Sequence, residues 1–498
     1  MNVNPITRLD YPDPDVIRVE DTYYMVSTTM HFMPGCEILQ SFDLVHWEHA
    51  TYVYETLDHT DAQQLKSGQN IYGQGMWAAS LRYHEGRFYI CFVANDTRKT
   101  YLYTSEKIDG PWKKQLIEGF YHDGSLLFDE DGRNYIVYGN DEIWITELNE
   151  DLTAPKKGGL HRLLVSDHKN PELGYEGSHI QKINGYYYIF LIHSLRDRWM
   201  RTEACFYSDS LEGEFTGGDV LCDDRGYCGQ GVAQGGIVDT PDGKWYAMLF
   251  QDSGAVGRIP ILLPVTWKDH FPVFGQNGHV PEEIEVHSTR PGYIYQPLVG
   301  SDDFCNGLLP RWQFNHDPDP RYYHLDALQG TYTITTREVC TELTQAVNTL
   351  TQRMSYPSCA AEVTVDASAL KEGDVAGLCA LQGCYAAVGI TKHHGKYEVL
   401  MLDKKEDGIL DMTERTVVES HQMDFRLEAD FCNMKDEARC YYRVNKGDWL
   451  PIGTVHKLYF KLDHFTGCRF GLFCYAAEET GGSACFRDFK YYDVDEIS

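Results

Sequence analysis

Positive charge is scarce in this sequence. The 498 residues include 44 Lys and Arg against 74 Asp and Glu, which gives a formal net charge of −30. A surface of this sign repels polyanions, so we exclude nucleic acid and anionic membranes as partners. The sequence also lacks any run of about 18 apolar residues, the length that predicts a membrane-spanning helix.

Two further patterns are missing. The N-terminal residues contain no basic segment followed by an apolar run, so no secretory signal is expected. The 15 cysteines are an odd number, and Cys222 and Cys228 lack the second pair that a zinc site needs. We therefore expect reduced thiols and a cytoplasmic location.

Helical periodicity is scarce as well, and short aromatic and β-branched runs bounded by Gly, Asp and Asn recur instead. One composite signal, a turn followed by an aromatic-rich strand, occurs five times at intervals of about 46 to 65 residues. This period predicts the blades of a five-bladed β-propeller, each with about four strands. An irregular β-meander is the alternative, but the copies share more than the turn. They are EDTYYMVST (20–28), EGRFYICFV (85–93), DGRNYIVYG (131–139), NGYYYIFLI (184–192) and DGKWYAMLF (242–250).

The five copies share a chemically distinctive position. When they are aligned on the last Tyr of each turn, the residue eleven or twelve places earlier is polar or aromatic. If the strand that follows it is the innermost of its blade, these side chains converge at one end of the propeller axis. The five residues are Asp13, Trp77, Asp123, Glu176 and Gln234.

Converging carboxylates interact and separate their pKa values, which lets one act as an acid and another as a base. Glycoside hydrolysis needs such a pair. Isolated aspartates in DG turns, such as Asp131 and Asp242, are assigned to the turns themselves. A calcium site is the competing interpretation, because hard oxygen ligands also cluster. It accounts for the carboxylates but not for Trp77, whose ring suits the face of a sugar.

Four segments resemble glycoside hydrolase family 43: YPDPDVIRVEDTYY, MWAASLRYHEGRFY, YHDGSLLFDEDGRNYIVYG and YEGSHIQKINGYYYIF. The resemblance covers nearly all of residues 1–295 in the order of the family. It implies a five-bladed propeller and inverting cleavage by a β-xylosidase, an α-L-arabinofuranosidase or an arabinanase. By motif position, Asp13 matches the general base and Glu176 the general acid. Asp123 matches the carboxylate that raises the pKa of the acid and orients it.

The resemblance also implies substrate-binding residues. Trp77 and Phe32 match aromatic walls of the pocket, and Met30 stands where relatives commonly carry an aromatic residue. For Phe32 and Met30, a place in the hydrophobic core is the alternative. Arg258, in VGRIPILL, matches an arginine that reaches the carboxylates.

The resemblance to the family does not lead us to expect a metal. Gln234 stands where relatives with an axial metal or water carry His. Because Gln is a weaker metal ligand, we expect no required cofactor, with a structural calcium ion as the alternative.

A second domain follows the propeller. Around residues 291–303 the blade pattern stops, and short strands with turns continue to the end of the sequence. We predict a propeller over residues 1–295 and a β-sandwich over residues 303–498. RWQFNHDPDP and NTLTQR resemble the concanavalin A-like jelly-roll domain attached to many β-xylosidases of the family. In relatives that domain packs on the propeller and narrows the pocket into an exo-acting cleft.

The sequence therefore predicts an all-β, inverting, exo-acting glycosidase that releases terminal β-1,4-linked D-xylose from xylo-oligosaccharides. The alternative enzyme is an α-L-arabinofuranosidase, because both pentoses fit one pocket. A non-catalytic glycan-binding propeller is the rival from another class, although a lectin has no need of three carboxylates. A retaining fructan hydrolase is disfavoured, since its nucleophile motif is absent. A homo-oligomer is left open.

Overall fold

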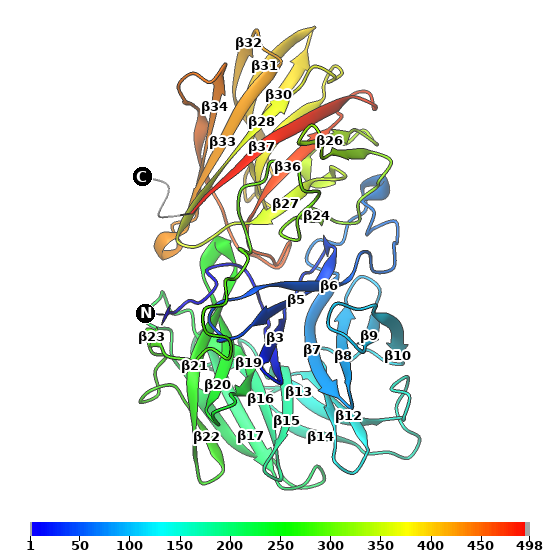
Figure 1. The fold of residues 1–498 in the computed structure, drawn as a ribbon, viewed down its shortest axis with the longest axis vertical. Coiled ribbons are helices and arrows are strands. Elements are labelled where there is room, and N and C mark those ends of the chain that lie inside the picture. The colour runs from blue at the N-terminus through cyan, green and yellow to red at the C-terminus, as the bar shows by residue number, and fades with distance from the viewer. Residues whose placement is uncertain (1, 494–498) are drawn as a thin grey trace.

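The computed structural model describes residues 2–493, and these form two β-domains stacked along the long axis of the molecule (Figure 1). The first domain contains five four-stranded antiparallel sheets in sequence order, which confirms the predicted five-bladed propeller. Among the described residues, no helix is long and apolar enough to cross a bilayer. The helices found between residues 2 and 493 are four 3₁₀ turns: η1 (Lys66–Gly68), η2 (Gly254–Val256), η3 (Leu343–Gln345) and η4 (Cys432–Met434).

Each blade is a meander whose strands follow one another in the sheet. Blade 1 has β2 (Asp15–Val19), β3 (Thr22–Val26), β5 (Gly35–Ser41) and β6 (Glu48–Tyr54). Blade 2 has β7 (Met76–His84), β8 (Arg87–Ala94), β9 (Lys99–Ser105) and β10 (Lys113–Ile117). Blade 3 has β11 (Ser125–Phe128), β12 (Asn134–Asn140), β13 (Glu142–Leu148) and β14 (His161–Ser166). Blade 4 has β15 (Glu176–Ile183), β16 (Tyr186–Ser194), β17 (Arg201–Ser208) and β18 (Thr216–Leu221), and blade 5 has β19 (Val232–Asp239), β20 (Trp245–Asp252), β21 (Arg258–Lys268) and β22 (Phe271–Phe274).

The first strand of each blade is the innermost. The strands β2, β7, β11, β15 and β19 contact one another around a closed ring. Hairpin turns fix the register of the first two strands. At Asn184 and Gly185, for example, φ is +50° and +85°, as a type I′ turn requires. Apolar residues that alternate along the strands are buried between neighbouring blades, which places the core between the sheets.

A buried polar network ties the inner strands together. Asp15, at the start of β2, accepts a hydrogen bond from Arg82 Nη1 on β7 at 2.8 Å and lies 3.1 Å from His179 Nδ1 on β15. Burial alone would raise the pKa of Asp15, but Arg82 and His179 outweigh burial and lower it. Asp15 therefore links three blades beneath the end of the axis where Asp13 lies.

The second domain is the predicted β-sandwich, built of an eight-stranded and a seven-stranded antiparallel sheet. The first sheet runs β32-β31-β30-β29-β36-β27-β24-β4, and the second runs β25-β26-β37-β28-β33-β34-β35. Residues 494–498 of the predicted domain lie outside the described residues. The bounds are β24 (Gln313–Asn315), β25 (Tyr323–Asp326), β26 (Thr331–Thr335), β27 (Leu350–Arg353), β28 (Ser358–Asp366), β29 (Val375–Leu381), β30 (Ala386–His393), β31 (Lys396–Lys404), β32 (Leu410–Val418), β33 (Gln422–Asp430), β34 (Glu437–Val444), β35 (Leu450–Lys457), β36 (Arg469–Tyr475) and β37 (Ser483–Asp493).

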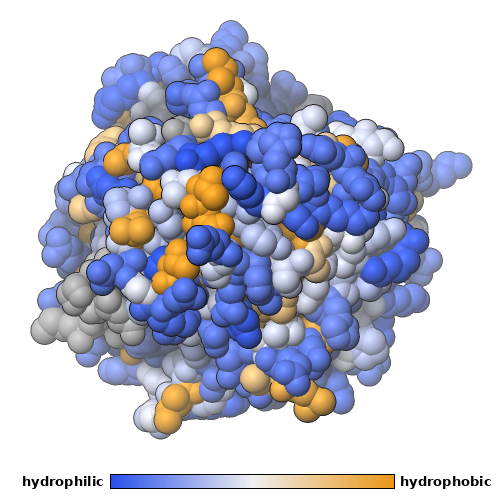
Figure 2. Space-filling view, turned by 90° about the horizontal axis from the view of Figure 1, so that it is seen from above, coloured by the Kyte–Doolittle hydropathy of each residue, from blue (hydrophilic) through white to orange (hydrophobic). Residues whose placement is uncertain are grey.

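The sandwich and the propeller share strands and ion pairs. The strand β4 (Phe32–Met33), which lies between β3 and β5 in the chain, pairs with β24 and so extends a sheet of the sandwich. Within the propeller domain, β1 (Asn2–Val3) pairs with β23 (Glu283–Ile284) and so joins the start of the chain to the segment that follows blade 5. Seen from the sandwich end, the surface is mostly hydrophilic with a few small apolar clusters (Figure 2).

A buried arginine joins the two domains. Arg353 of β27 places Nη1 2.8 Å from Glu37 Oε2 of β5 and donates from Nε to the backbone oxygen of Asp10 at 2.9 Å. Its guanidinium also covers the ring of Tyr11 at 4.0 Å. Burial alone would raise the pKa of Glu37, but Arg353 and His49 outweigh it and lower that pKa. The pair therefore holds a charge of each sign in an interface from which water is excluded.

We predict that Arg353→Met destabilises the protein by about 3–5 kcal/mol, because it leaves the Glu37 carboxylate buried without its cation. Urea denaturation followed by tryptophan fluorescence measures the loss. The matched control is Arg133→Met, whose partner Asp131 is exposed, and it should cost less than about 0.5 kcal/mol. Equal losses in the two variants would contradict the role given to Arg353.

Candidate active site

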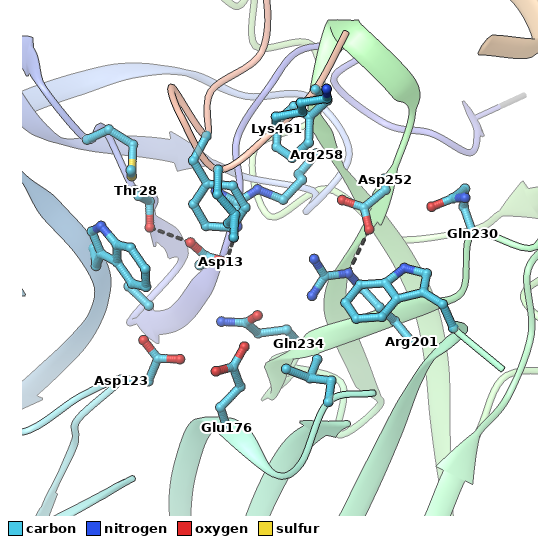
Figure 3. A pocket seen from close by; sticks show the side chains of 18 of the residues that line it. Asp13, Thr28, Asp123, Glu176, Arg201, Gln230, Gln234, Asp252, Arg258 and Lys461 are labelled. Carbon is cyan, nitrogen blue, oxygen red and sulfur yellow. Dashed lines mark hydrogen bonds and ion pairs between the residues drawn. The ribbon is translucent and has the colours of Figure 1, made fainter. Parts of the chain in front are cut away.

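A cavity of about 560 Å³ lies at the end of the propeller axis that faces the sandwich (Figure 3). All five residues of the shared repeat position line it. They lie in the loops that enter the inner strands or at the first residues of those strands. The repeat phase found in the sequence therefore places these side chains together in space, as predicted.

Asp13 is held by two donors from different parts of the propeller. Thr28 Oγ1 donates to its Oδ2 at 2.6 Å, and Arg258 Nη1 donates to its Oδ1 at 2.9 Å. The backbone at Asp13 has a φ of +53°, a conformation that Asp tolerates better than most residues. Asp13 and Arg258 are only 6% and 2% exposed, so they mark the deep end of the cavity.

The other two carboxylates lie close together with a histidine. His122 offers a ring nitrogen, and Asp123 and Glu176 each offer a carboxylate oxygen. These three atoms lie within 4.8 Å of one another. His122 Nε2 is 3.4 Å from Glu176 Oε2 and 3.5 Å from Asp123 Oδ2. The backbone N–H of Gly177 donates to Asp123 at 3.0 Å, and Asn140 Nδ2 donates to Glu176 at 2.7 Å.

Burial and neighbouring charges set the protonation of this cluster. Burial, aided by the charges of Glu176 and Asp13, outweighs His122 and raises the pKa of Asp123 to about 6. Burial alone would lower the pKa of His122, but Asp123 and Glu176 outweigh it and raise that pKa to about 9. The imidazolium therefore supplies a positive charge between the two carboxyl groups at neutral pH. Such coupled groups share protons as a unit.

Loops of the sandwich form the roof of the cavity. Phe460, Lys461, Leu462 and Phe465 line it from the segment that precedes β36, and Met434 lines it from η4. The ring of Phe465 lies 4.2 Å from the Arg258 guanidinium and 5.7 Å from the ring of Trp77. The C-terminal domain therefore shapes the pocket, as expected from the resemblance.

Phe32 requires a correction. It was expected to form an aromatic wall, but it does not line the cavity and is 2% exposed within a cluster of the sandwich core. Its backbone pairs with Asn315, and the Arg469 guanidinium lies 3.5 Å from its ring. Phe32 contacts the second domain because β4 crosses to the sheet of that domain. Among the aromatic rings near the Arg258 guanidinium, that of Phe465 from the sandwich lies nearest, at 4.2 Å.

The remaining predicted binding residues do line the cavity. Trp77 places its ring edge-on to His122 at 5.7 Å, and Met30 pairs through its backbone with Met76. Gln234 donates its backbone N–H to Glu203 at 2.7 Å, which leaves its carboxamide facing the cavity beside Glu176 (Figure 3).

The sequence did not single out several lining residues. His122 adjoins Asp123 in YHDGSL, and this adjacency was a usable signal. Thr28 and Asn140 follow inner hairpins without any local motif. Trp199 and Arg201 lie at the start of the third strand of blade 4, and Asp252 ends the second strand of blade 5; all three fall outside the repeated segments.

His122, Asp123 and Glu176 are the only cluster of three metal-type side chains that the described part of the chain brings this close. They fit a cation poorly, since the raised pKa of His122 means that a cation would have to displace a proton. The expectation that the protein requires no metal stays a prediction.

Comparison with known proteins defines the class. Residues 3–272 match the model of glycosyl hydrolases family 43, and residues 301–492 match that of the Beta xylosidase C-terminal Concanavalin A-like domain. The chain therefore belongs to glycosyl hydrolase family 43, which confirms the resemblance found in the sequence.

Individual relatives agree with this assignment. A Beta-xylosidase of Formosa agariphila is 27% identical over 99% of this chain and 89% of its own length. A Xylosidase/arabinosidase of Butyrivibrio fibrisolvens is 24% identical over 99% of both chains. A solved Bifunctional GH43-CE protein of Bacteroides eggerthii is 42% identical, with a TM-score of 0.93. That match covers all of this chain but only 64% of the solved chain.

The raised pKa of Asp123 makes the stability of the protein depend on pH. That pKa is about 6 in the folded protein and 3.8 ordinarily, so the folded state binds this proton more tightly than the unfolded chain. Stability is therefore lost as the pH rises from about 4 to about 6. We predict that Asp123→Asn, which does not titrate, is more stable than the unchanged protein by about 1–3 kcal/mol at pH 7.5. The gain should shrink towards pH 4.

Thermal melting at the two pH values measures this difference. The control is Asp131→Asn, because the hydrogen bond from Arg133 lowers the pKa of exposed Asp131 and no gain is expected there. A destabilised Asp123→Asn variant at pH 7.5 would refute the assignment.

Proposed function

We propose that this chain is an inverting, exo-acting β-xylosidase that releases terminal β-1,4-linked D-xylose from xylo-oligosaccharides. The observation that carries the proposal is the convergence of Asp13, Asp123 and Glu176 at the deep end of a cavity roofed by the second domain. The relative from Formosa agariphila, which is matched over 89% of its own length, is named Beta-xylosidase.

In the proposed reaction, Glu176 protonates the glycosidic oxygen and so helps the bond to the leaving sugar break. Asp13 removes a proton from a water molecule that attacks the anomeric carbon from the opposite face. The donors Thr28 and Arg258 orient Asp13 for this step. Asn140 and His122 orient Glu176.

Inversion follows from where the acid and base originate. Asp13 precedes blade 1 and Glu176 begins blade 4, so they approach the sugar from separate sides. An inverting pair needs room for water, roughly 6.5–9.5 Å between carboxyl groups. The close pair, Asp123 and Glu176, would suit retention only if Asp123 were the nucleophile. Its burial and raised pKa oppose that role.

Exo action is supported by the roof of the cavity. A polysaccharide bound along its length needs a groove that is open at both ends. Here Phe460 and Phe465 cover the deep end beside Arg258, at 5.9 and 4.2 Å from its guanidinium. A chain end can occupy such a pocket, and the rest of the oligosaccharide then leaves through the open side.

The second candidate is an α-L-arabinofuranosidase. A full-length relative is named Xylosidase/arabinosidase, and the same acid and base serve both pentoses.

We also infer that nucleic acid and anionic membranes are not partners, because the net charge is −30. We place the enzyme in the cytoplasm, acting on short oligosaccharides, and expect it to function without a metal.

Proton NMR during hydrolysis of xylobiose tests the proposal, with an arabinosyl xylo-oligosaccharide as the parallel substrate. Initial release of α-xylose supports both the substrate and inversion. Initial β-xylose means retention and refutes the roles given to Asp13 and Asp123. Release of arabinose alone favours the second candidate, and binding without hydrolysis favours a glycan-binding protein.

Substitution of the acid and the base gives a further prediction. Asp13→Asn and Glu176→Gln should each lower kcat on xylobiose by about 10²–10⁴-fold. Glu176→Gln should retain more activity on an aryl xyloside, because an acidic phenol leaves without protonation. Asp13→Asn should lose activity on both substrates, because the water attack is always needed. Stopped assays with Asp131→Asn as control measure these rates, and near-normal turnover by either variant would overturn its role.

A further inference from the structure

One side of the cavity has no part in the proposed chemistry. Arg201, the first residue of β17, is 8% exposed, and its Nε donates to Asp252 Oδ2 at 2.6 Å. Asp252 is the last residue of β20 in the next blade. Figure 3 shows the guanidinium of Arg201 and the carboxylate of Asp252 side by side at the cavity, across from Asp13.

This pair has unused hydrogen-bonding groups. Asp252 Oδ1 is buried and has no hydrogen-bond partner within the described residues. Arg201 contacts Asp252 through Nε. Its two Nη groups donate to no residue between 2 and 493 and are therefore available to a ligand. A buried carboxylate oxygen without a donor is unfavourable, so it is an effective acceptor for a ligand hydroxyl. An acceptor beside a fork of N–H donors matches two neighbouring hydroxyls of a sugar ring.

Trp199 adds a surface for stacking. It lines the same cavity and is 45% exposed, and the Arg201 guanidinium lies 5.3 Å from its ring centroid. An exposed tryptophan on a cavity wall offers an apolar face for the C–H groups of a sugar. Stacking and a diol contact together are what a pyranose requires.

The position of this group indicates which sugar it contacts. Trp199 and Arg201 belong to blade 4, which also supplies Glu176, the proposed proton donor to the leaving oxygen. Asp13 and Arg258 lie at the deep end, where the terminal sugar would bind, whereas exposed Trp199 and Glu172 lie at the rim. The sugar that departs therefore lies on the Trp199 side.

We propose that Trp199, Arg201 and Asp252 form a subsite for the leaving sugar, with a neutral pyranose as ligand, an inference that rests on the proposed function. Arg201 and Asp252 balance each other in charge, and Glu172 adds a negative charge at the rim. The subsite therefore does not favour a uronic acid. A purely structural ion pair would leave Asp252 Oδ1 without a role.

The test compares leaving groups that do and do not fill the subsite. Xylobiose carries a leaving sugar, whereas β-D-xylosyl fluoride releases only fluoride and presents nothing to Trp199. We expect Trp199→Ala and Asp252→Asn to lower kcat/KM on xylobiose by about 10- to 100-fold. On the fluoride, both variants should stay within about threefold of the unchanged protein, since no subsite contact is lost. If arabinose is the sugar released, the matching arabinosyl oligosaccharide and arabinofuranosyl fluoride replace this pair.

The controls are Tyr83→Ala and Asp131→Asn. Tyr83 is 44% exposed, close to the value for Trp199, and neither residue lines the cavity. Both should act normally on both substrates. Trp199→Ala removes an exposed side chain, so it tests the subsite even if Asp252→Asn does not fold.

The outcomes separate the two proposals. If the unchanged protein cleaves neither kind of substrate, the proposed function fails and the subsite fails with it. If the unchanged protein is active and Trp199→Ala loses both substrates equally, or loses neither, only the subsite is refuted. Selective loss on the disaccharide supports it.

Discussion

The cavity depends on holding three carboxyl groups together where water is largely excluded. Each is compensated from another blade: Asp13 by Arg258 of blade 5, Asp123 by the backbone N–H of Gly177 in blade 4, and Glu176 by Asn140 of blade 3. His122 supplies the positive charge between the last two. Without the closed ring, these like charges would repel one another in a low dielectric. The propeller therefore creates the site as a consequence of its closure.

The geometry of the cavity also depends on the second domain, and Asp10 makes the connection. One of its carboxylate oxygens accepts from the backbone N–H of Arg258 at 2.8 Å, and the other accepts from that of Gly467 at 2.7 Å. Gly467 ends the sandwich loop that carries Phe465 over the cavity. A Cβ there would lie 2.2 Å from the Val256 oxygen, so only glycine allows this approach. Asp10 thus joins the arginine that orients Asp13 to the loop that roofs the cavity.

These links explain which features the sequence predicted. The turn-and-strand repeat reports local structure, and a common phase within it fixes a common direction, so Asp13, Trp77, Asp123, Glu176 and Gln234 were found together. Phe32 was misplaced because its burial depends on β4 crossing to the other domain, a pairing between residues about 280 apart. Phe465, Arg201 and Asp252 reach the cavity by long-range packing and leave no periodic signal. Local pattern thus predicts the inner ring but not its roof or rim.

The walls of the cavity carry buried polar atoms that have no hydrogen-bond partner among the described residues. Trp77 Nε1, Arg258 Nε and Nη2, and Asp252 Oδ1 are buried without partners among the described residues, and the three side chains that carry these four atoms line the cavity. Buried polar groups are normally satisfied, so these four atoms on the walls of one cavity are suited to a ligand with many hydrogen-bonding groups. The first three lie near the deep end, and Asp252 lies across from them. A ligand that satisfies both sets must extend past Glu176, as a sugar linked to a second sugar does.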